Sequence, residues 1–147
     1  MPTADPAIGT HFRIDFQGKI KGAFRECTGM GSEHEVVEYK ASDEKGRELI
    51  KKVPGRMKWN NITLKRGIVA NTVDMWNWRK DVEEGNIDKA RTNGSIILCD
   101  GNGTEIARWD FNNAWPCKLV GPAPNAANSE IAIEELEITH EGYTRKN

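Results

Sequence analysis

Short runs in which apolar and polar residues alternate make up most of the chain, and such alternation is typical of half-buried β-strands. The first run, residues 10–17, has phenylalanine or isoleucine at every second position, which places these side chains on one face of a strand. Gly18 ends this run, and residues 22–27 are expected to return as the second arm of a hairpin. Further strands are expected over residues 33–41, 56–66, 95–99, 104–113 and 129–140.

Two of the expected strands change the parity of their apolar positions halfway along. Residues 56–66 begin with apolar residues at odd positions and continue with them at even positions, which predicts a β-bulge at Asn60–Asn61. Residues 129–140 show the same change, which predicts a second slip at Glu134–Glu135. Two bulged antiparallel strands favour a barrel or a strongly bent sandwich.

One segment has helical periodicity instead. Asn71 or Thr72 is a suitable N-cap for a helix that runs to about Glu84, and Gly85 is a suitable C-terminal stop. An apolar stripe at helical spacing faces a core far more often than it holds a cofactor. The stripe residues are Met75, Trp78 and Val82.

Turns and loops separate these elements. Asp100–Gly103 predicts a tight hairpin turn, and Val53–Gly55 predicts another. Residues 42–52 are dense in charge and predict a long exposed loop or hairpin tip. In the run Trp109–Pro116 the aromatic face is expected to pack in the core, and Pro116 is expected to end regular pairing because it lacks an N–H group.

Composition narrows the class of protein. The chain has 147 residues and a net charge of −1, which suits one globular domain and disfavours binding to duplex nucleic acid. No run approaches the roughly 20 apolar residues that span a bilayer, and the N-terminus resembles no secretory signal, so we expect folding in a cytosol. An odd number of widely spaced cysteines predicts free thiols that behave as small buried hydrophobes. They are Cys27, Cys99 and Cys117.

Patterns that would carry chemistry are missing from the sequence. The three histidines lie far from one another and from any cysteine, so no residues have zinc-ligand spacing. The two Gly-x-Gly steps neither reach a third glycine nor open a helix, so they predict turns rather than a phosphate site. No Gly-x-Ser-x-Gly elbow is present. We therefore predict a protein that is not an enzyme, with no catalytic, cofactor-binding or metal-binding residue; only a site assembled from distant residues stays open.

Acidic residues concentrate on two of the expected strands. A hydrated sheet face is the ordinary explanation for such a pattern. The alternative is an assembly in which one of these faces lines a channel. The first strand carries Glu33, Glu35 and Glu38, and the last carries Glu130, Glu134, Glu135, Glu137 and Glu141.

A series of short motifs follows the same order along residues 12–143. The clearest is Trp109–Pro116, and the others include Asn61–Gly67 and the tryptophan-bearing helix. The remaining pieces are Phe24–Gly29, Pro54–Gly55, Ile96–Asp100 and Ala132–Gly142. In this order the motifs resemble the tail-tube, or inner-tube, proteins of contractile phage tails and phage-tail-like contractile injection systems.

This resemblance implies a mainly β fold, a bent antiparallel β-sandwich or barrel with one outer α-helix, and a single domain over residues 1–147. Residues 1–9 would form a flexible arm. Six copies would form a ring with a continuous inner β-barrel, and rings would stack into a rigid hollow tube. Sheath contraction would propel this tube through a target envelope, after assembly in a bacterial cytoplasm. The implied partners are further copies, a sheath, a baseplate with its spike, a tube terminator, and a tape-measure protein or protein cargo; neither a cofactor, nor sequence-specific nucleic acid, nor stable membrane insertion is implied.

The resemblance also assigns roles to two segments. Residues 42–53 would project as a charged loop or hairpin that touches the neighbouring ring, and their mixed charges favour a polar contact over an apolar one. The candidates for this contact are Asp43, Glu44, Lys45, Arg47, Glu48, Lys51 and Lys52. The strands over residues 33–41 and 56–66 would line the channel. Their lumen candidates are Glu33, Glu35 and Glu38.

Other functions remain open on the sequence. The same architecture occurs in the tube of a phage tail proper and in the ring protein of a type VI secretion system. A different class is a monomeric β-barrel that binds a small ligand, which would be a soluble monomer with a pocket.

Overall fold

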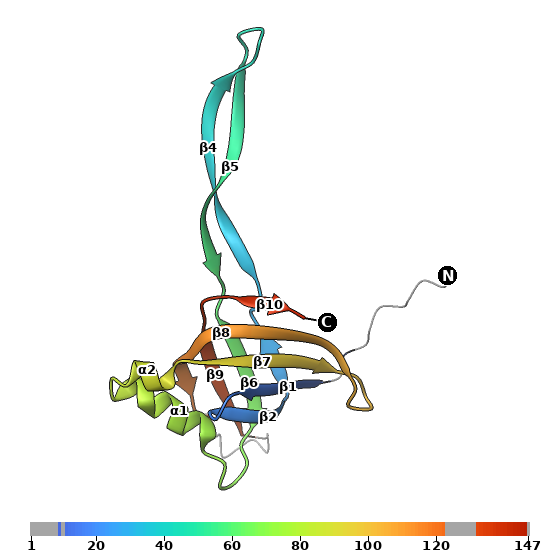
Figure 1. Ribbon diagram of the computed structural model, residues 1–147, viewed down its shortest axis with the longest axis vertical. Coiled ribbons are helices and arrows are strands. Elements are labelled where there is room, and N and C mark those ends of the chain that lie inside the picture. The colour runs from blue at the N-terminus through green and yellow to red at the C-terminus, as the bar shows by residue number, and fades with distance from the viewer. Residues whose placement is uncertain (1–8, 10, 123–131, 147) are drawn as a thin grey trace, which may run out of the picture.

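A barrel of β-strands carries a long two-stranded ribbon that projects from one end (Figure 1). The structure is a computed structural model, and it describes residues 9, 11–122 and 132–146. The expected arm over residues 1–9 lies outside this part of the chain apart from Gly9. Most of the linker at residues 122–128 and the start of the expected last strand, including Glu130, lie outside it as well.

The main sheet has eight strands in the order β2-β1-β7-β8-β9-β6-β3, with β10 beside β8, and all of its pairs are antiparallel. The strands before the ribbon are β1 (His11–Phe16), β2 (Ile20–Phe24) and β3 (Glu26–Thr28). The ribbon consists of β4 (Ser32–Ser42) and β5 (Glu48–Trp59). The later strands are β6 (Ile62–Gly67), β7 (Thr92–Cys99), β8 (Glu105–Val120), β9 (Ile133–Thr139) and β10 (Tyr143–Arg145).

The sheet closes on itself through one strand that changes partner. Only Arg25 separates β2 from β3, and its N–H donates to the carbonyl of Lys65 on β6 at 3.0 Å. Residues 20–28 therefore bond to β1 along their first half and to β6 along their second half. Closure removes the free edges that an open sheet would leave along this strand. The sequence predicted either a barrel or a strongly bent sandwich, and the structure is a barrel.

Large apolar side chains fill the barrel. Phe16 lies at its centre, with ring centroids 5.5 Å from Trp78 and 6.3 Å from Phe111, and all three side chains are buried. Gly94 is required beside Phe16, because a Cβ at this position would collide with the Phe16 ring. The expected strand faces are confirmed for Ile14, Phe16 and Phe111, which all lie in this core.

The helix α1 (Asp74–Glu83) covers the barrel with its apolar stripe, as predicted, since Met75 and Trp78 are buried. The helix begins at Asp74 rather than after Asn71 or Thr72, because Asn71 has a φ of 65° and lies in a turn. Gly85 ends it with a φ of 84°, as expected. A second short helix, α2 (Ile87–Ala90), was not predicted, and its Ala90 carbonyl accepts a 2.7 Å hydrogen bond from the Trp78 indole.

Strand β8 continues through Pro116, so the prediction that this residue ends the pairing was wrong. Pro116 is buried and lies opposite Ile138 of β9. The register shifts between Pro116 and Lys118, so a bulge at Cys117 follows the position that lacks an N–H. The hairpin turn expected at Asp100–Gly103 is present, with the Gly103 N–H donating to the Asp100 carbonyl at 3.0 Å.

The expected phase slip in the last strand is absent, because Glu134 takes a place in the buried face of β9. Glu134 is only 2% exposed and shares this face with Leu136 and Ile138. Its carboxylate accepts hydrogen bonds from Arg66 Nε at 2.8 Å and Trp76 Nε1 at 2.9 Å. Arg66 also binds both carboxylate oxygens of Asp74 at the start of α1. A buried carboxylate is tolerated when it is paired in this way, so the expectation that Glu134 is a solvated surface acid was wrong.

The ribbon also differs from the sequence prediction in where its β-bulge and its turn lie. Asn60–Asn61 form no bulge; they are the connection at which the chain leaves β5 and enters β6 of the barrel. Val53–Gly55 lie inside β5 and not in a turn, and the turn is at the tip, Asp43–Arg47. A register shift between His34 and Val36 places the bulge at Gly55–Arg56, opposite one residue of β4.

A cluster of aromatic residues anchors the base of the ribbon to the barrel. Trp59, the last residue of β5, lies 4.9 Å from Tyr143 between ring centroids, and Phe111 lies 5.0 Å from His140. The Gly142 N–H donates to His140 Nδ1 at 3.1 Å, so the ring is neutral and Nε2–H donates to the Asn60 carbonyl at 3.0 Å. Burial lowers the pKa of His140 from its ordinary value of 6.5, because the charged imidazolium would lose its hydration.

The neutral state of His140 predicts that acid weakens the fold. The unfolded chain takes up a proton at His140 near pH 6.5, whereas the folded chain resists protonation until a lower pH. Stability is therefore fully present above this value and falls as the pH drops below it. Urea unfolding of the wild type should lose more free energy between about pH 7 and pH 5 than His140→Gln does. The exposed His34→Gln is the control and should keep the wild-type slope; equal slopes for wild type and His140→Gln would contradict this prediction.

The buried pair of Glu134 and Arg66 predicts a strong stability effect. Glu134→Ala leaves the Arg66 guanidinium under-paired in the barrel wall and should lower the free energy of unfolding by about 3 kcal/mol. Glu135→Ala, the next residue along β9, points to the other face and should change stability by less than about 0.5 kcal/mol. Urea denaturation followed by tryptophan fluorescence compares the two variants, and a loss of similar size in both would show that Glu134 has no special role.

Candidate functional site

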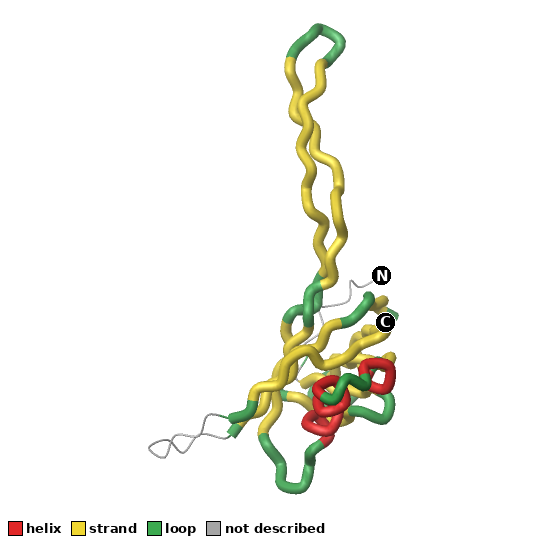
Figure 2. The backbone as a smooth tube through the Cα atoms, turned by 90° about the vertical axis from the view of Figure 1, so that its left-hand side faces the viewer, coloured by secondary structure: helices red, strands yellow, loops and turns green. Residues whose placement is uncertain are grey.

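The projecting ribbon is the candidate functional site. Within the described chain its two strands pair only with each other, and they extend away from the barrel (Figure 2). An isolated two-stranded ribbon buries little apolar surface and is marginally stable in water. Covering one of its faces with another surface would stabilise it.

One face of the ribbon is mainly apolar. The register pairs Val37 with Val53 and Ala41 with Leu49, and residues in register point to the same face. We call this the apolar face of the ribbon, and its residues are Val37, Tyr39, Ala41, Leu49, Lys51 and Val53. Its large apolar side chains are all exposed. Alternation over residues 37–41 and 49–53 would have revealed this face, but the charge density of residues 42–52 favoured a loop.

The opposite face of the ribbon is bound together by ion pairs. Glu38 and Lys52 lie across from each other with 3.8 Å between their charged atoms, and Lys40 reaches diagonally to Glu48 at 3.1 Å. These pairs are exposed, so each contributes at most about 1 kcal/mol to stability. Their pairing leaves the charged part of this face neutral, and the face also carries exposed Ile50 opposite Lys40 and exposed Val36 nearer the barrel.

The tip of the ribbon is organised by Asp43. Its Oδ1 accepts from the backbone N–H groups of Lys45 at 2.9 Å and Arg47 at 2.7 Å, and its Oδ2 pairs with the Arg47 guanidinium at 2.9 Å. Gly46 completes the turn with a φ of 75°. This is a local hydrogen-bonded turn built by one acidic side chain.

The predicted contact residues fall into two groups. Four of them pair with a charge inside the ribbon, and the other three form no ion pair with any residue that the structure describes. The paired residues are Asp43, Arg47, Glu48 and Lys52, and the others are Glu44, Lys45 and Lys51. That these residues touch a neighbouring ring stays a prediction.

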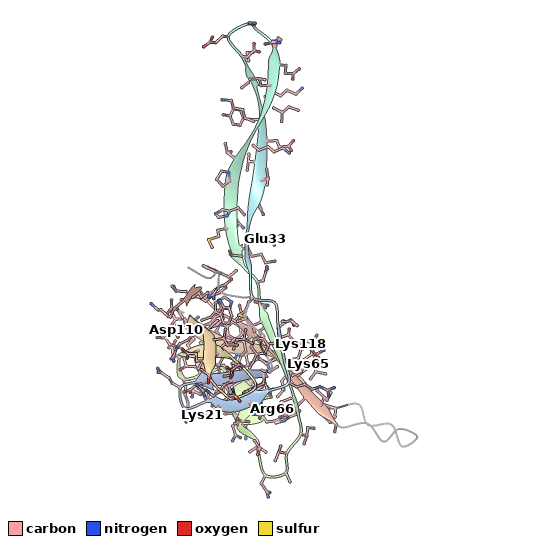
Figure 3. All side chains as sticks on the ribbon, turned by 90° about the vertical axis from the view of Figure 1, so that its right-hand side faces the viewer. Lys21, Glu33, Lys65, Arg66, Asp110 and Lys118 are labelled. Atoms are coloured by element: carbon pink, nitrogen blue, oxygen red, sulfur yellow. The ribbon has the colours of Figure 1, made fainter. Side chains whose placement is uncertain are left out.

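The three lumen candidates lie on different faces of β4. Glu33 and Glu35 share the side of β4 that carries Val37, whereas Glu38 points to the opposite side with Lys52. Glu33 lies at the base of the ribbon, and the other labelled charges surround the barrel (Figure 3). That these residues line a channel stays a prediction. Because they lie on both faces of β4, no single face of the strand presents all three carboxylates.

No group of His, Cys, Asp or Glu in residues 9, 11–122 and 132–146 could hold a metal ion. The cysteines are free, as predicted, and burial raises the pKa of Cys27 to about 12 and that of Cys117 to about 11, so neither thiol ionises at neutral pH. Among the helices of this part of the chain, none is long and apolar enough to cross a membrane.

One polar cluster on the barrel resembles a catalytic arrangement but lacks a base. Ser95 Oγ donates to Asp110 Oδ1 at 2.6 Å, and Arg108 Nε donates to the same oxygen at 3.0 Å. The hydrogen bond from Ser95, together with Arg108, lowers the pKa of Asp110. A lowered pKa makes a carboxylate a weaker proton acceptor, and the hydrogen bonds of this cluster tie β7 to β8.

Three solved structures have a similar fold. A chain in the sheath–tube complex of PVC, an extracellular contractile injection system, has a TM-score of 0.80 and 22% identity over 96% of this chain and 91% of that chain. The tube-terminating cap of the anti-feeding prophage has a TM-score of 0.80 and 23% identity, over 99% and 94%. Hcp1 from Flavobacterium johnsoniae has a TM-score of 0.56 and 12% identity, over 92% and 94%.

The family of the chain follows from its sequence match. No curated protein matches the sequence significantly. The family model of the T4-like virus tail tube protein gp19 matches residues 9–144, nearly the whole chain. Each of the three similar structures also covers more than nine-tenths of this chain. The protein therefore belongs to the T4-like virus tail tube protein family.

Proposed function

We propose that the chain is the inner-tube subunit of a phage-tail-like contractile injection system. The observation that carries this proposal is the ribbon, whose apolar face has no cover within the described chain. A tube made of repeated copies supplies such a cover for every subunit except those at one end. The family match over residues 9–144 and the similar folds in PVC and anti-feeding prophage particles support the same function.

In this function the subunit acts mechanically rather than as a catalyst. Contacts between unlike surfaces of identical copies are heterologous, and they close into a ring when the rotation between neighbours permits. Six copies would form each ring, and ribbons would link one ring to the next. The stacked rings would form a rigid hollow tube inside a sheath, with a baseplate and spike at one end and a terminator at the other.

The lumen of this tube would be lined by polar side chains. Hydrophilic walls let a tape-measure protein or a protein cargo slide, because no apolar surface holds it. Acidic side chains would also repel nucleic acid and avoid the adhesion by counterion release that basic walls produce. Glu33 and Glu35 on one face of β4, or Glu38 on the other, are the residues we propose for this lining.

Assembly would take place in a bacterial cytoplasm, and the mature tube would be part of an extracellular or anchored particle. A phage tail proper is the second candidate, because the matching family is that of a T4-like virus tail tube protein. A type VI secretion ring is a further one, because a type six secretion system protein has a similar fold with a TM-score of 0.63. A monomeric ligand binder is less consistent with the barrel, whose centre is filled by Phe16, Trp78 and Phe111.

Electron microscopy of the purified protein tests this function. The full-length chain is expected to form rings and tubes as its concentration rises. A variant in which an asparagine–glycine turn replaces residues 38–52 removes the outer ribbon but none of the barrel core. This variant should keep the circular dichroism and urea midpoint of the barrel and should form no tubes.

The result that contradicts the proposed function is equally clear. A full-length chain that stays monomeric at high concentration, and that binds a small molecule with the barrel folded, would belong to a different class of protein. Tubes that form normally from the shortened variant would show that the ribbon is not the contact that builds them.

A further inference from the structure

The ribbon joins the barrel through two short connections that lie side by side. Residues 29–31 lead into β4 and residues 60–61 lead out of β5, and neither connection has regular secondary structure. One backbone hydrogen bond links them, from the Asn60 N–H to the Gly31 carbonyl at 3.0 Å. Gly29 has a φ of 93°, a conformation that favours glycine. A paired element pivots at connections of this kind, because a few residues absorb the change in backbone angles.

The ribbon is long compared with these connections, so a small turn at its base moves its tip far. Strand β4 has 11 residues and is therefore about 35 Å long. A tilt of about 20° at the base displaces the tip by about 12 Å over this length. Within the described chain the two strands pair only with each other (Figure 1). The direction of the ribbon must therefore be fixed by contacts at its base.

Trp59 and His140 make contacts of this kind. Trp59 packs against Tyr143 and His140, with ring centroids 4.9 and 6.0 Å away. A Cβ on Gly142 would come within 3.3 Å of the Trp59 indole, so this glycine leaves room for the ring. His140 donates from Nε2–H to the Asn60 carbonyl at 3.0 Å and accepts at Nδ1 from the Gly142 N–H at 3.1 Å. One neutral imidazole thus ties the end of the ribbon to the turn between β9 and β10.

A proton on Nδ1 is incompatible with this arrangement. Nδ1 would become a donor that faces the Gly142 N–H, which is also a donor, so this hydrogen bond would be lost. The His140 side chain is buried, so the imidazolium would lose its hydration as well, and this burial lowers the pKa of His140. A ring released to water has the ordinary pKa of 6.5, so release is favoured below this value and increases as the pH falls.

The rings packed on His140 carry no charge that would compensate the added proton. They belong to Trp59 of β5, Phe111 of β8 and Tyr143 of β10, and of these only the Tyr143 phenol can titrate. The charged residues nearest to them along the chain either point to the opposite face of their strand or contact other side chains. These residues are Lys58, Asp110, Glu141 and Arg145.

We propose that Trp59 and His140 form a latch that fixes the direction of the ribbon, and that protonation of His140 opens it. With a neutral ring, the ribbon is held in the direction that Figure 1 shows. With a protonated ring, the ribbon pivots about residues 29–31 and 60–61 while the barrel stays folded, because the core around Phe16 includes neither residue of the latch. The latch goes beyond the proposed function and lies within one copy, so it is measurable without any assembly.

Distances between the ribbon tip and the barrel test the latch in the full-length chain. Two fluorophores are attached to p-acetylphenylalanine that replaces Lys45 in the tip and Asp88 in α2, which are both exposed. Single-molecule energy transfer is measured in a solution dilute enough to keep the copies separate. The wild type should show a narrow distribution of distances at about pH 7.5, and this distribution should widen by about twofold at about pH 5.

Three variants separate the latch from a general effect of acid. His140→Gln cannot gain a proton and should show the same distribution at both pH values. Trp59→Ala removes the ring that the latch holds, and its distribution should be broad already at about pH 7.5. His34→Gln, an exposed histidine on the ribbon, is the matched control and should respond to pH as the wild type does. Circular dichroism at each pH follows the fold of the barrel.

Four results would overturn the latch. The first is a wild-type distribution of equal width at both pH values, and the second is a wild-type response to pH in His140→Gln. The third is a narrow distribution for Trp59→Ala, which would show that other contacts fix the ribbon. The fourth is unfolding of the barrel over the same pH range as the widening, because the ribbon would then have no motion of its own. All four leave the proposed tube function intact, since they concern a single copy.

Discussion

A two-stranded ribbon has no interior, and this constraint governs the molecule. Two paired strands satisfy their backbone hydrogen bonds along one edge each, but they cannot bury the side chains on either face. Here one face of β4 and β5 is mainly apolar, and the other is neutralised by ion pairs. The protomer therefore carries an element whose stability is completed only by another surface, which is the property expected of a subunit whose function is assembly.

The closed barrel supplies the rigid body that such a subunit needs. Its sheet closes through residues 20–28, and its centre is packed by aromatic rings. At one end, Trp59 and His140 join the ribbon to the barrel. At the other end, Glu134 holds Trp76 at the surface. The ribbon and the surface around Trp76 are therefore connected through a single packed unit, so their relative position is set by the barrel core.

Much of the fold was predictable from local patterns. Alternation located the first hairpin and the strand faces of Ile14 and Phe111, and helical spacing located the buried stripe of α1. These predictions were correct because period and face are properties of a few consecutive residues. The same reasoning wrongly predicted a solvated surface for Glu134, because its burial depends on Arg66 and Trp76, which are far away in the sequence. The change of parity at Asn60–Asn61 was real, but its cause is a change of sheet rather than a bulge.

The sequence by itself determined the family, the β character of the chain, the single long helix and the positions of most strands. Each of these follows from residue order and periodicity. Only the tertiary structure decided that the sheet closes into a barrel, that Pro116 and Glu134 lie in its wall, and that the ribbon separates an apolar face from a paired one. The physical reason is that a strand pattern defines two faces but not what covers them, since cross-strand register and long-range partners are set when distant segments meet.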